Sequence, residues 1–165
     1  MSDDIAAKFT EAEIVPDVLS TAPTKKLTIN YPGKPEIEAG STMHVLDVRH
    51  APKVTYPGTE GSYYTLIMID PDNLSRTNPS QREWLNWIVI NIPADAIAEG
   101  MMSRHLVGYM GPSPQPRTGL HRVVFLLFEH VKRKLNQPAI KARSKFSVKA
   151  FMEKHELGSK PVASL

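Results

Sequence analysis

Apolar residues along this chain gather into short runs that are separated by segments rich in proline, glycine and charged residues. This pattern predicts many short strands joined by ordered loops. The strands are expected at residues 26–31, 42–48, 53–56, 63–69, 87–92, 106–110 and 122–129. The runs at 63–69, 87–92 and 122–129 are apolar at nearly every position, which is typical of central strands covered on both faces.

Two helices are predicted, one near each terminus. The first covers residues 3–12, with Ser2 or Asp3 as its N-cap, and the second covers residues 148–157, with Ser147 as its N-cap. A chain of many strands with helices only near its ends favours a β-sandwich over a fold of alternating strands and helices. The predicted fold class is therefore mainly β, with short peripheral helices.

The length and composition indicate one domain, residues 1–165. The chain has no cysteine, which excludes disulfides and thiolate chemistry and fits a reducing compartment. Its start, "MSDDIAAKF", lacks the pattern of a secretory signal, and no apolar run approaches the roughly 18 residues of a membrane span. We expect a cytoplasmic monomer without stable membrane insertion.

The net charge of +3 is unevenly distributed, because residues 132–149 contain seven basic side chains and no acid. This basic segment can be a patch for anionic surfaces or a solvated face balanced by acids elsewhere. Aromatic residues do not alternate with its charges as they do in base-stacking platforms, so no nucleic-acid partner is expected.

The loop "DPDNLSRTNPSQREWLNW", residues 70–87, follows the apolar run 63–69. Pro71 disfavours a helical conformation at Asp70, which holds that carboxylate extended at the end of the strand. One interpretation is the rim of a ligand pocket with a tryptophan wall, and the other is a salt-bridged turn. Both depend on the same side chains: Asp70, Asp72, Arg76, Arg82 and Trp84.

A second loop, "GPSPQPRTGLHR", leads from Gly111 into the most apolar predicted strand. Its prolines make it stiff, and His121 stands at the entrance of that strand. An imidazole in this position can donate to the oxygen of an anion. Alternatively, His121 is a core histidine with its hydrogen bonds satisfied, and Arg122 pairs with an acid.

The sequence lacks the usual patterns of catalysis. It has no G-x-S-x-G elbow, no glycine-rich phosphate cradle and no cluster of histidines or cysteines with metal-ligand spacing. We therefore expect a protein that is not an enzyme, with no catalytic residues, no cofactor and no metal.

Together, the two loops resemble the phosphatidylethanolamine-binding protein family, which includes the Raf kinase inhibitor proteins and the plant flowering regulators. The family signature D-P-D-x-P-S-R, continuing to R-E-W-H-H, is similar to "DPDNLSR" and "REWLNW" here. A second signature, a glycine- and proline-rich loop leading into G-x-H-R, is similar to "GPSPQPRTGLHR". Similar stretches cover nearly the whole chain in order. The resemblance implies a sandwich of two antiparallel sheets with a small anion-binding pocket at one end.

The resemblance also implies roles for individual residues. The expected ligand-binding residues are Asp70, Pro71, Asp72, Trp84, Asn86, Gly111, Pro114 and His121. The expected structural supports are Ser75, Arg76, Arg82 and Arg122.

Several positions depart from the family pattern. Asn86 replaces a second pocket histidine, Val123 replaces a tyrosine, and Leu74 replaces a proline whose peptide bond is often cis. The chain also stops before the family's C-terminal helix, which predicts a more open pocket. We expect these changes to weaken anion binding, because neither Asn86 nor Val123 supplies the replaced group.

The expected function is non-enzymatic binding of a phosphorylated or carboxylate small ligand, including a phospholipid headgroup. The resemblance implies a protein kinase or protease as the macromolecular partner. The alternative is an interaction protein with a degraded pocket that acts through its surface and the basic segment 132–149.

Overall fold

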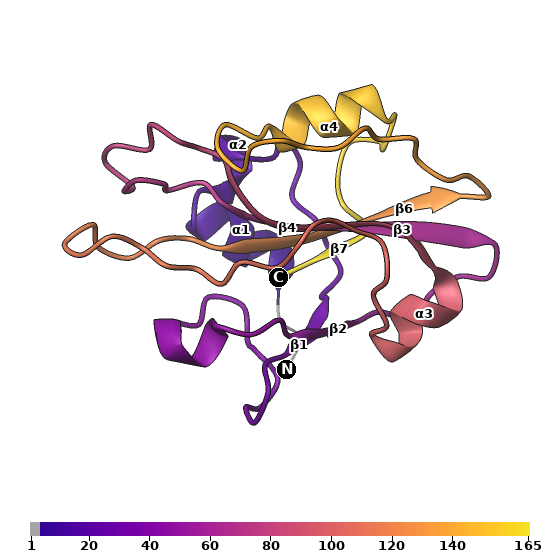
Figure 1. Ribbon diagram of the computed structural model, residues 1–165, viewed down its shortest axis with the longest axis horizontal. Helices are drawn as coiled ribbons and strands as arrows, with labels where there is room; N and C mark the ends of the chain where they lie inside the picture. The colour runs from indigo at the N-terminus through magenta and orange to yellow at the C-terminus, as the bar shows by residue number, and fades with distance from the viewer. Residues whose placement is uncertain (1–3) are drawn as a thin grey trace.

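The computed structural model describes residues 4–165, which fold around a five-stranded antiparallel sheet (Figure 1). Its strands, in spatial order, are β5 (His105–Val107), β4 (Trp84–Pro93), β3 (Ser62–Asp70), β6 (Val124–Val131) and β7 (Ala163–Ser164). A second antiparallel sheet consists of β1 (Thr28–Asn30) and β2 (Lys53–Thr55). The predicted class, mainly β with two antiparallel sheets and short helices, is confirmed.

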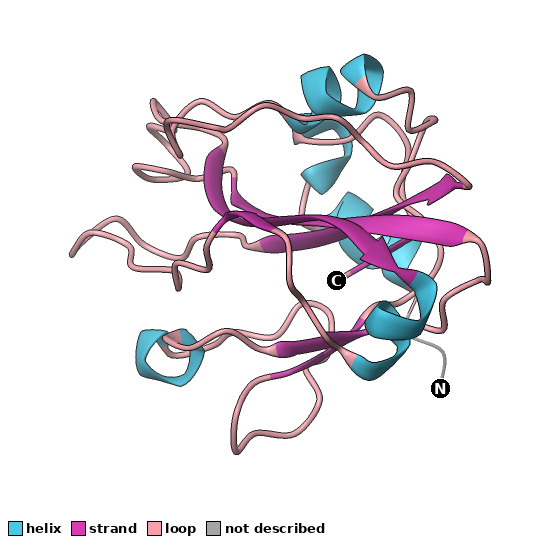
Figure 2. Cartoon of the chain, turned by 45° about the vertical axis from the view of Figure 1, so that its right-hand side comes forward, coloured by secondary structure: helices cyan, strands magenta, loops and turns pink. Residues whose placement is uncertain are grey.

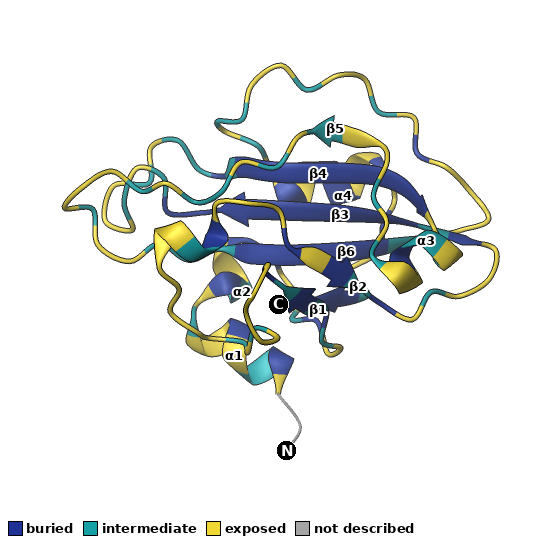
Figure 3. Ribbon diagram, turned by 60° about the horizontal axis from the view of Figure 1, so that its bottom comes forward, coloured by how far each residue is buried: buried dark blue, intermediate teal, exposed yellow. Residues whose placement is uncertain are grey.

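The central strands are apolar on both faces because each face of the larger sheet has its own core. On one face, Ile67 and Ile69 pack with residues of the terminal helices. On the other face, Leu66 and Met68 pack with residues of the small sheet. Figure 2 shows this layered arrangement, and Figure 3 shows β3, β4 and β6 as almost continuously buried. The burial of apolar surface from both sides explains why these three runs do not alternate.

The helices are α1 (Ile5–Glu11), α2 (Ile14–Asp17), α3 (Ala94–Glu99) and α4 (Val148–Lys154), with a 3₁₀ helix η1 (Val45–Val48). Asp4 caps α1 by accepting from the Ala7 amide at 3.0 Å, whereas the predicted caps Ser2 and Asp3 lie outside the described residues. Ser147 caps α4 as predicted, accepting from the Ala150 amide at 3.1 Å.

Some local predictions are wrong. The run 42–48 is not a strand, because its second half forms η1, where His44 Nδ1 accepts from the Leu46 amide at 3.2 Å. Helix α3 was not predicted from the sequence. The Asn73–Leu74 peptide bond is cis, although residue 74 is not a proline.

The antiparallel order of the sheet brings the two signature loops to the same end of the molecule. Asp70, the last residue of β3, pairs with Trp84, the first residue of β4, and Ile69 pairs with Val124 at the start of β6. Residues 71–83 and 108–123 therefore emerge together, at the left of Figure 1.

A buried carboxylate connects the first signature loop to α4. The backbone of Glu83 exchanges hydrogen bonds with that of Phe146, and Oε1 accepts from the Val148 amide at 2.7 Å. The residue is only 8% exposed. Burial raises the pKa of Glu83 to about 7, although the Val148 amide and the charges of Arg82 and Lys149 act in the opposite direction.

Replacing Glu83 should change how stability depends on pH. The ordinary pKa of the carboxyl is 4.5, so between pH 4.5 and about 7 the folded state holds a proton that the unfolded state releases. Stability therefore falls as pH rises through this window. Glu83→Gln keeps an acceptor for Val148 but cannot ionise. Between pH 5 and 8, the decrease in its free energy of unfolding should therefore be smaller than that of the wild type by up to about 3 kcal/mol.

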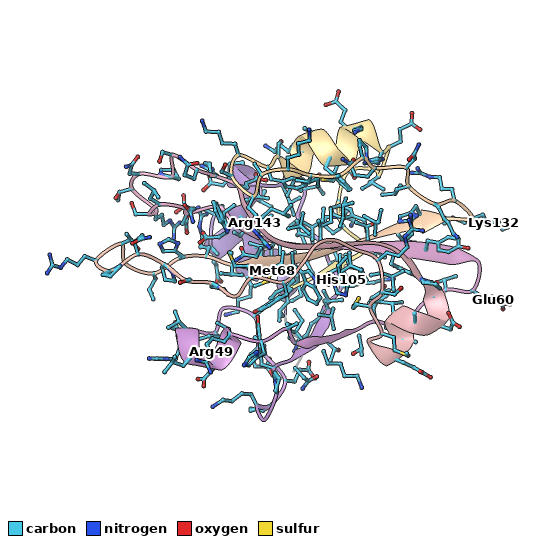
Figure 4. The ribbon with its side chains drawn as sticks, in the orientation of Figure 1. Arg49, Glu60, Met68, His105, Lys132 and Arg143 are labelled. Atoms are coloured by element: carbon cyan, nitrogen blue, oxygen red, sulfur yellow. The ribbon has the colours of Figure 1, made fainter. Side chains whose placement is uncertain are left out.

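Urea unfolding at several pH values measures this difference. The control is Glu60→Gln, at an exposed position at the other end of the sheet (Figure 4). It should leave the pH profile unchanged. Parallel profiles for the wild type and Glu83→Gln would contradict the assignment.

Candidate functional site

The centre of the site is a contact between Asp70 at the end of β3 and His121, three residues before β6. Asp70 Oδ2 lies 2.7 Å from His121 Nδ1, and the side chains are 7% and 3% exposed, respectively. The pairing of β3 with β6 brings the two residues together across a separation of 51 positions. The carboxylate thus fixes the orientation of the imidazole ring.

The other ring nitrogen of His121 faces Thr118. Its Nε2 is 2.9 Å from Thr118 Oγ1, and the Thr118 hydroxyl donates to the Gln115 carbonyl at 2.7 Å. Because that hydroxyl hydrogen is already in use, Oγ1 is left to accept from the Nε2–H of His121. The ring therefore presents a donor to the loop, opposite the nitrogen that Asp70 holds. Thr118 was not predicted from the sequence, where nothing marks it as a neighbour of His121.

The two aspartates of the loop have different electrostatic surroundings. Burial raises the pKa of Asp70 above its usual value, although hydrogen bonds from His121 and from the Asp72 amide act in the opposite direction. Burial would also raise the pKa of Asp72, but hydrogen bonds from the Arg122 side chain and backbone, together with its charge, lower it overall. Arg122 thus favours the ionised form of Asp72, whereas burial opposes ionisation of Asp70.

Arg122 is the partner of Asp72, in agreement with the alternative that Arg122 pairs with an acid, and neither Arg76 nor Arg82 forms this ion pair. Arg122 donates to the Asp72 carboxylate through its backbone amide at 2.8 Å, Nε at 2.9 Å and Nη2 at 2.6 Å. Asp72 is fully buried. Arg76 instead pairs with Glu13 at 2.9 Å, because its loop lies against the N-terminal segment.

Arg122 also reaches the N-terminal segment. Its Nη1 donates to the Ala12 carbonyl at 3.0 Å and to Asp17 Oδ2 at 2.9 Å. Arg82 makes a further contact with this segment, 3.4 Å from the Asp17 carbonyl. The short-range sequence pattern could not reveal these contacts, since more than 60 positions separate the partners.

Asn86, at the place of the second pocket histidine, is 2% exposed. Its Nδ2 donates to the Met110 carbonyl at 2.9 Å, and its Oδ1 has no hydrogen-bond partner within residues 4–165. One of the two N–H groups of the amide is therefore engaged by the second loop, and the buried oxygen is an acceptor, which does not favour an anion. Unlike the histidine that it replaces, Asn86 cannot become cationic.

The remaining predicted residues hold the two loops in place. Trp84 is half-buried at the start of β4, and Pro71 is buried beside Asp70. Ser75 Oγ accepts from the Asn78 amide at 3.0 Å within its turn. Gly111 packs so closely that an added Cβ would lie 2.5 Å from the Val48 carbonyl oxygen. Any side chain there would displace the backbone of one of the two segments.

Beside His121 lies a cavity of about 550 Å³, called here the lateral cavity. Residues of α1, of the segment 37–48 and of the segment 119–125 line it. Four of the predicted residues contribute to this lining: Arg76, Pro114, His121 and Arg122. Asp70, Trp84, Asn86 and Gly111 do not. His121 therefore belongs both to the buried pair with Asp70 and to the wall of an open cavity.

Neither a metal cluster nor a membrane helix is found in the described part of the chain. Among residues 4–165, no group of three or more histidine, cysteine, aspartate or glutamate side chains could hold a metal ion. In the same range, no helix is both long and apolar enough to cross a bilayer.

The fold and the site define a β-sandwich protein with a buried carboxylate–histidine pair between two loops at one end. Residues 20–165 match the model of the phosphatidylethanolamine-binding protein family, and the chain belongs to that family. It is similar to Protein SELF-PRUNING of Solanum lycopersicum, with 35% identity over 167 residues that cover 98% of this chain and 93% of that protein.

Two solved structures share the fold. The phosphatidylethanolamine-binding protein from Plasmodium vivax has a TM-score of 0.79 and 23% identity, covering 96% of this chain and 93% of that one. The carboxypeptidase Y inhibitor, in complex with its cognate proteinase, has a TM-score of 0.78 and 21% identity, covering 96% of this chain and 91% of that one. The expectation of family membership is confirmed.

Removing the Asp72 carboxylate should destabilise the protein strongly. Asp72→Asn leaves the Arg122 guanidinium without its main counter-charge in a site that is 11% exposed, and we expect a loss of about 3 kcal/mol at pH 7. Because the pKa of Asp72 is lowered in the folded state, its stabilisation is present at neutral pH and disappears as the carboxyl becomes protonated in acid. Unfolding in guanidinium chloride at pH 7 and in acid measures both the loss at neutral pH and its disappearance in acid.

The matched control is Asp17→Asn, which removes the outer carboxylate from the same arginine. The Asp17 side chain is 36% exposed, so this change should cost no more than about 1 kcal/mol. Equal losses for the two variants would show that burial of Asp72 does not determine its contribution.

Proposed function

We propose that this chain is a non-enzymatic binding protein that takes the phosphoryl or carboxylate group of a small ligand at His121. The observation that carries the proposal is the 2.7 Å contact between Asp70 and His121 in a nearly closed environment. A carboxylate behind an imidazole stabilises its charged form and leaves the opposite N–H available to an anion.

Thr118 occupies the place that the anion would take. An oxygen of the ligand replaces Thr118 Oγ1 as the acceptor of the His121 Nε2–H. A hydrogen bond to an anionic oxygen in a water-poor site is stronger than one to a neutral hydroxyl. The exposed loop 115–118 can move aside, because the hydrogen-bond partners of the Thr118 side chain, Gln115 and His121, are nearby in the sequence.

The affinity should be low. Asn86 gives one N–H to Met110 and cannot become cationic, and Val123 has no hydroxyl, so neither residue is equivalent to the histidine or tyrosine of the family pattern. Each missing hydrogen bond to a charged ligand is worth about 1.5–3 kcal/mol, or tenfold or more in affinity.

The macromolecular partner that we propose is a protein kinase or a protease. The similarity to a proteinase inhibitor of the same fold supports the protease. The cysteine-free composition supports a cytoplasmic location, where such a partner would meet a monomer of this chain.

A second candidate function is an interaction protein that uses the basic segment 132–149 rather than the pocket. Two arginines of this segment are already committed to backbone carbonyls, Arg133 to His155 and Arg143 to Leu85, Asn86 and Gly108. Figure 4 shows Arg143 between the segment leading to α4 and the sheet. Lys149 likewise donates to the Pro16 carbonyl at 3.3 Å. Fewer basic side chains of the segment then remain for a partner, so we favour the pocket.

Titration with phosphorylethanolamine, inorganic phosphate and acetate, followed by backbone amide shifts, tests the proposed site. We expect saturable shifts at Asp70, Thr118 and His121, with dissociation constants in the millimolar range. Binding should strengthen as pH falls, because a bound anion favours the imidazolium over the neutral ring.

His121→Gln should weaken binding at least tenfold and remove most of this pH dependence. The control is His50→Gln, at an exposed position outside the site, which should change neither property. If His121→Gln retains the full affinity and pH profile, the proposal is wrong. Shifts confined to residues 132–149 would favour the second candidate.

A further inference from the structure

The lateral cavity has the size and composition of a small-molecule site. Its volume of about 550 Å³ lies within the range of roughly 300–1,000 Å³ that is typical of ligand pockets. Apolar and aromatic side chains from three separate parts of the chain face it, among them Phe9, Ile14, Tyr31, Val45, Leu120 and Phe125. Side chains from such distant segments are brought together only by the fold.

The rim of the lateral cavity exposes large apolar side chains to water. Leu120 is 74% exposed, Val45 41% and Met43 37%, and all three line the cavity. They come from the second signature loop and from the segment around η1. Exposed apolar surface that gathers at the mouth of a cavity is unfavourable in water and is characteristic of a binding site. A ligand with an apolar part would cover it.

The charges around the lateral cavity favour a ligand with a negative group. Lys8, Arg76 and Arg122 line it, although Arg76 pairs with Glu13 and Arg122 pairs with Asp72 and Asp17. Among the described lining residues, Glu38 is the one acidic side chain, so basic side chains outnumber acidic ones on this wall. The Lys8 amine is half-exposed and 4.0 Å from Glu11, so it can also interact with a ligand. Arg122 directly follows His121 in the chain, at the proposed anion site.

We propose that the lateral cavity binds the hydrocarbon chain of an anionic single-chain amphiphile whose charged group lies at His121. The position of the head group rests on the proposed function, whereas the chain site rests on the cavity alone. Both His121 and Leu120 line the cavity, so one continuous ligand would reach the imidazole and the apolar wall once Thr118 and its loop move aside as proposed above. The expected ligand class is a fatty acid or an alkyl phosphate.

A chain-length series separates the cavity from the head-group site. Calorimetry with alkyl phosphates of six to twelve carbons, kept below their micelle concentrations, should show affinity rising about fourfold per added methylene until the cavity is full. The matched alkyl alcohols should show the same slope with weaker binding at every length. An affinity that does not depend on chain length would overturn the proposal, even if every alkyl phosphate binds.

The two sites also fail in distinguishable ways. If the alcohols and phosphates bind equally and share the slope, the chain site stands and the anion site of the proposed function fails. If His121→Gln removes the advantage of the phosphate but keeps the slope, both assignments hold.

Two variants test the cavity itself. Ala39→Phe adds a ring at a lining position and should shorten the chain length at which affinity stops rising. Leu120→Ala removes apolar wall from an exposed loop residue, where folding is not at risk, and should weaken decyl phosphate binding at least threefold. The control is Met101→Ala, a 62% exposed residue outside the lining, which should leave binding unchanged.

Equal affinities for wild type, Ala39→Phe and Leu120→Ala would overturn the proposal. So would a complex in which a partner protein inserts an apolar side chain into the cavity while the amphiphiles show no measurable binding. In that case the rim of Met43, Val45 and Leu120 would be a protein interface.

Discussion

The buried ion pair between Asp72 and Arg122 is the interaction on which the rest of the site depends. It joins the loop after β3 to the segment before β6, and through Ala12 and Asp17 it also holds the N-terminal segment. Asp70 lies two residues before Asp72, and His121 is adjacent to Arg122. The Asp72–Arg122 ion pair therefore positions the Asp70–His121 pair, because Asp72 is a near neighbour of Asp70 in the chain and Arg122 is adjacent to His121.

The separation of these two roles follows from the surroundings of two carboxylates only two positions apart. Asp72 meets a guanidinium and a backbone amide, which keep it ionised despite complete burial. Asp70 meets an imidazole and one amide, and burial dominates its pKa. A fixed ion pair gives rigidity, whereas a carboxylate beside a histidine can respond to a ligand or to a proton. Within three residues, the loop thus holds a carboxylate in a fixed ion pair, Asp72, and a carboxylate beside a histidine, Asp70.

The lateral cavity gives this end of the molecule an apolar surface beside the buried Asp70–His121 pair. The segment 119–125 forms the boundary, since it supplies His121 to the buried pair and Leu120, Val123 and Phe125 to the cavity. A ligand that uses both would gain affinity from apolar burial as well as from charge. This gain would offset the loss of the histidine and the tyrosine of the family pattern, which Asn86 and Val123 replace.

The sequence by itself determined the central strands and the two loops. Unbroken apolar runs identified β3, β4 and β6 because these strands are covered on both faces, and Ser147 identified the start of α4 through local capping. The motif around Asp70 and His121 identified the family, which the match over residues 20–165 confirms. Only local pattern and short-range chemistry are needed for these conclusions.

Only the tertiary structure decided which charges pair and where space remains. Asp72 forms its ion pair with Arg122 and not with Arg76, which is nearer in the sequence, because the pairing of β3 with β6 brings residue 122 beside it. Residues 45–48 form η1 rather than part of a strand, and Met43, Val45 and Val48 line the lateral cavity instead of joining a sheet. Ion pairs and cavities depend on contacts between distant segments, and no local pattern in the sequence records those contacts.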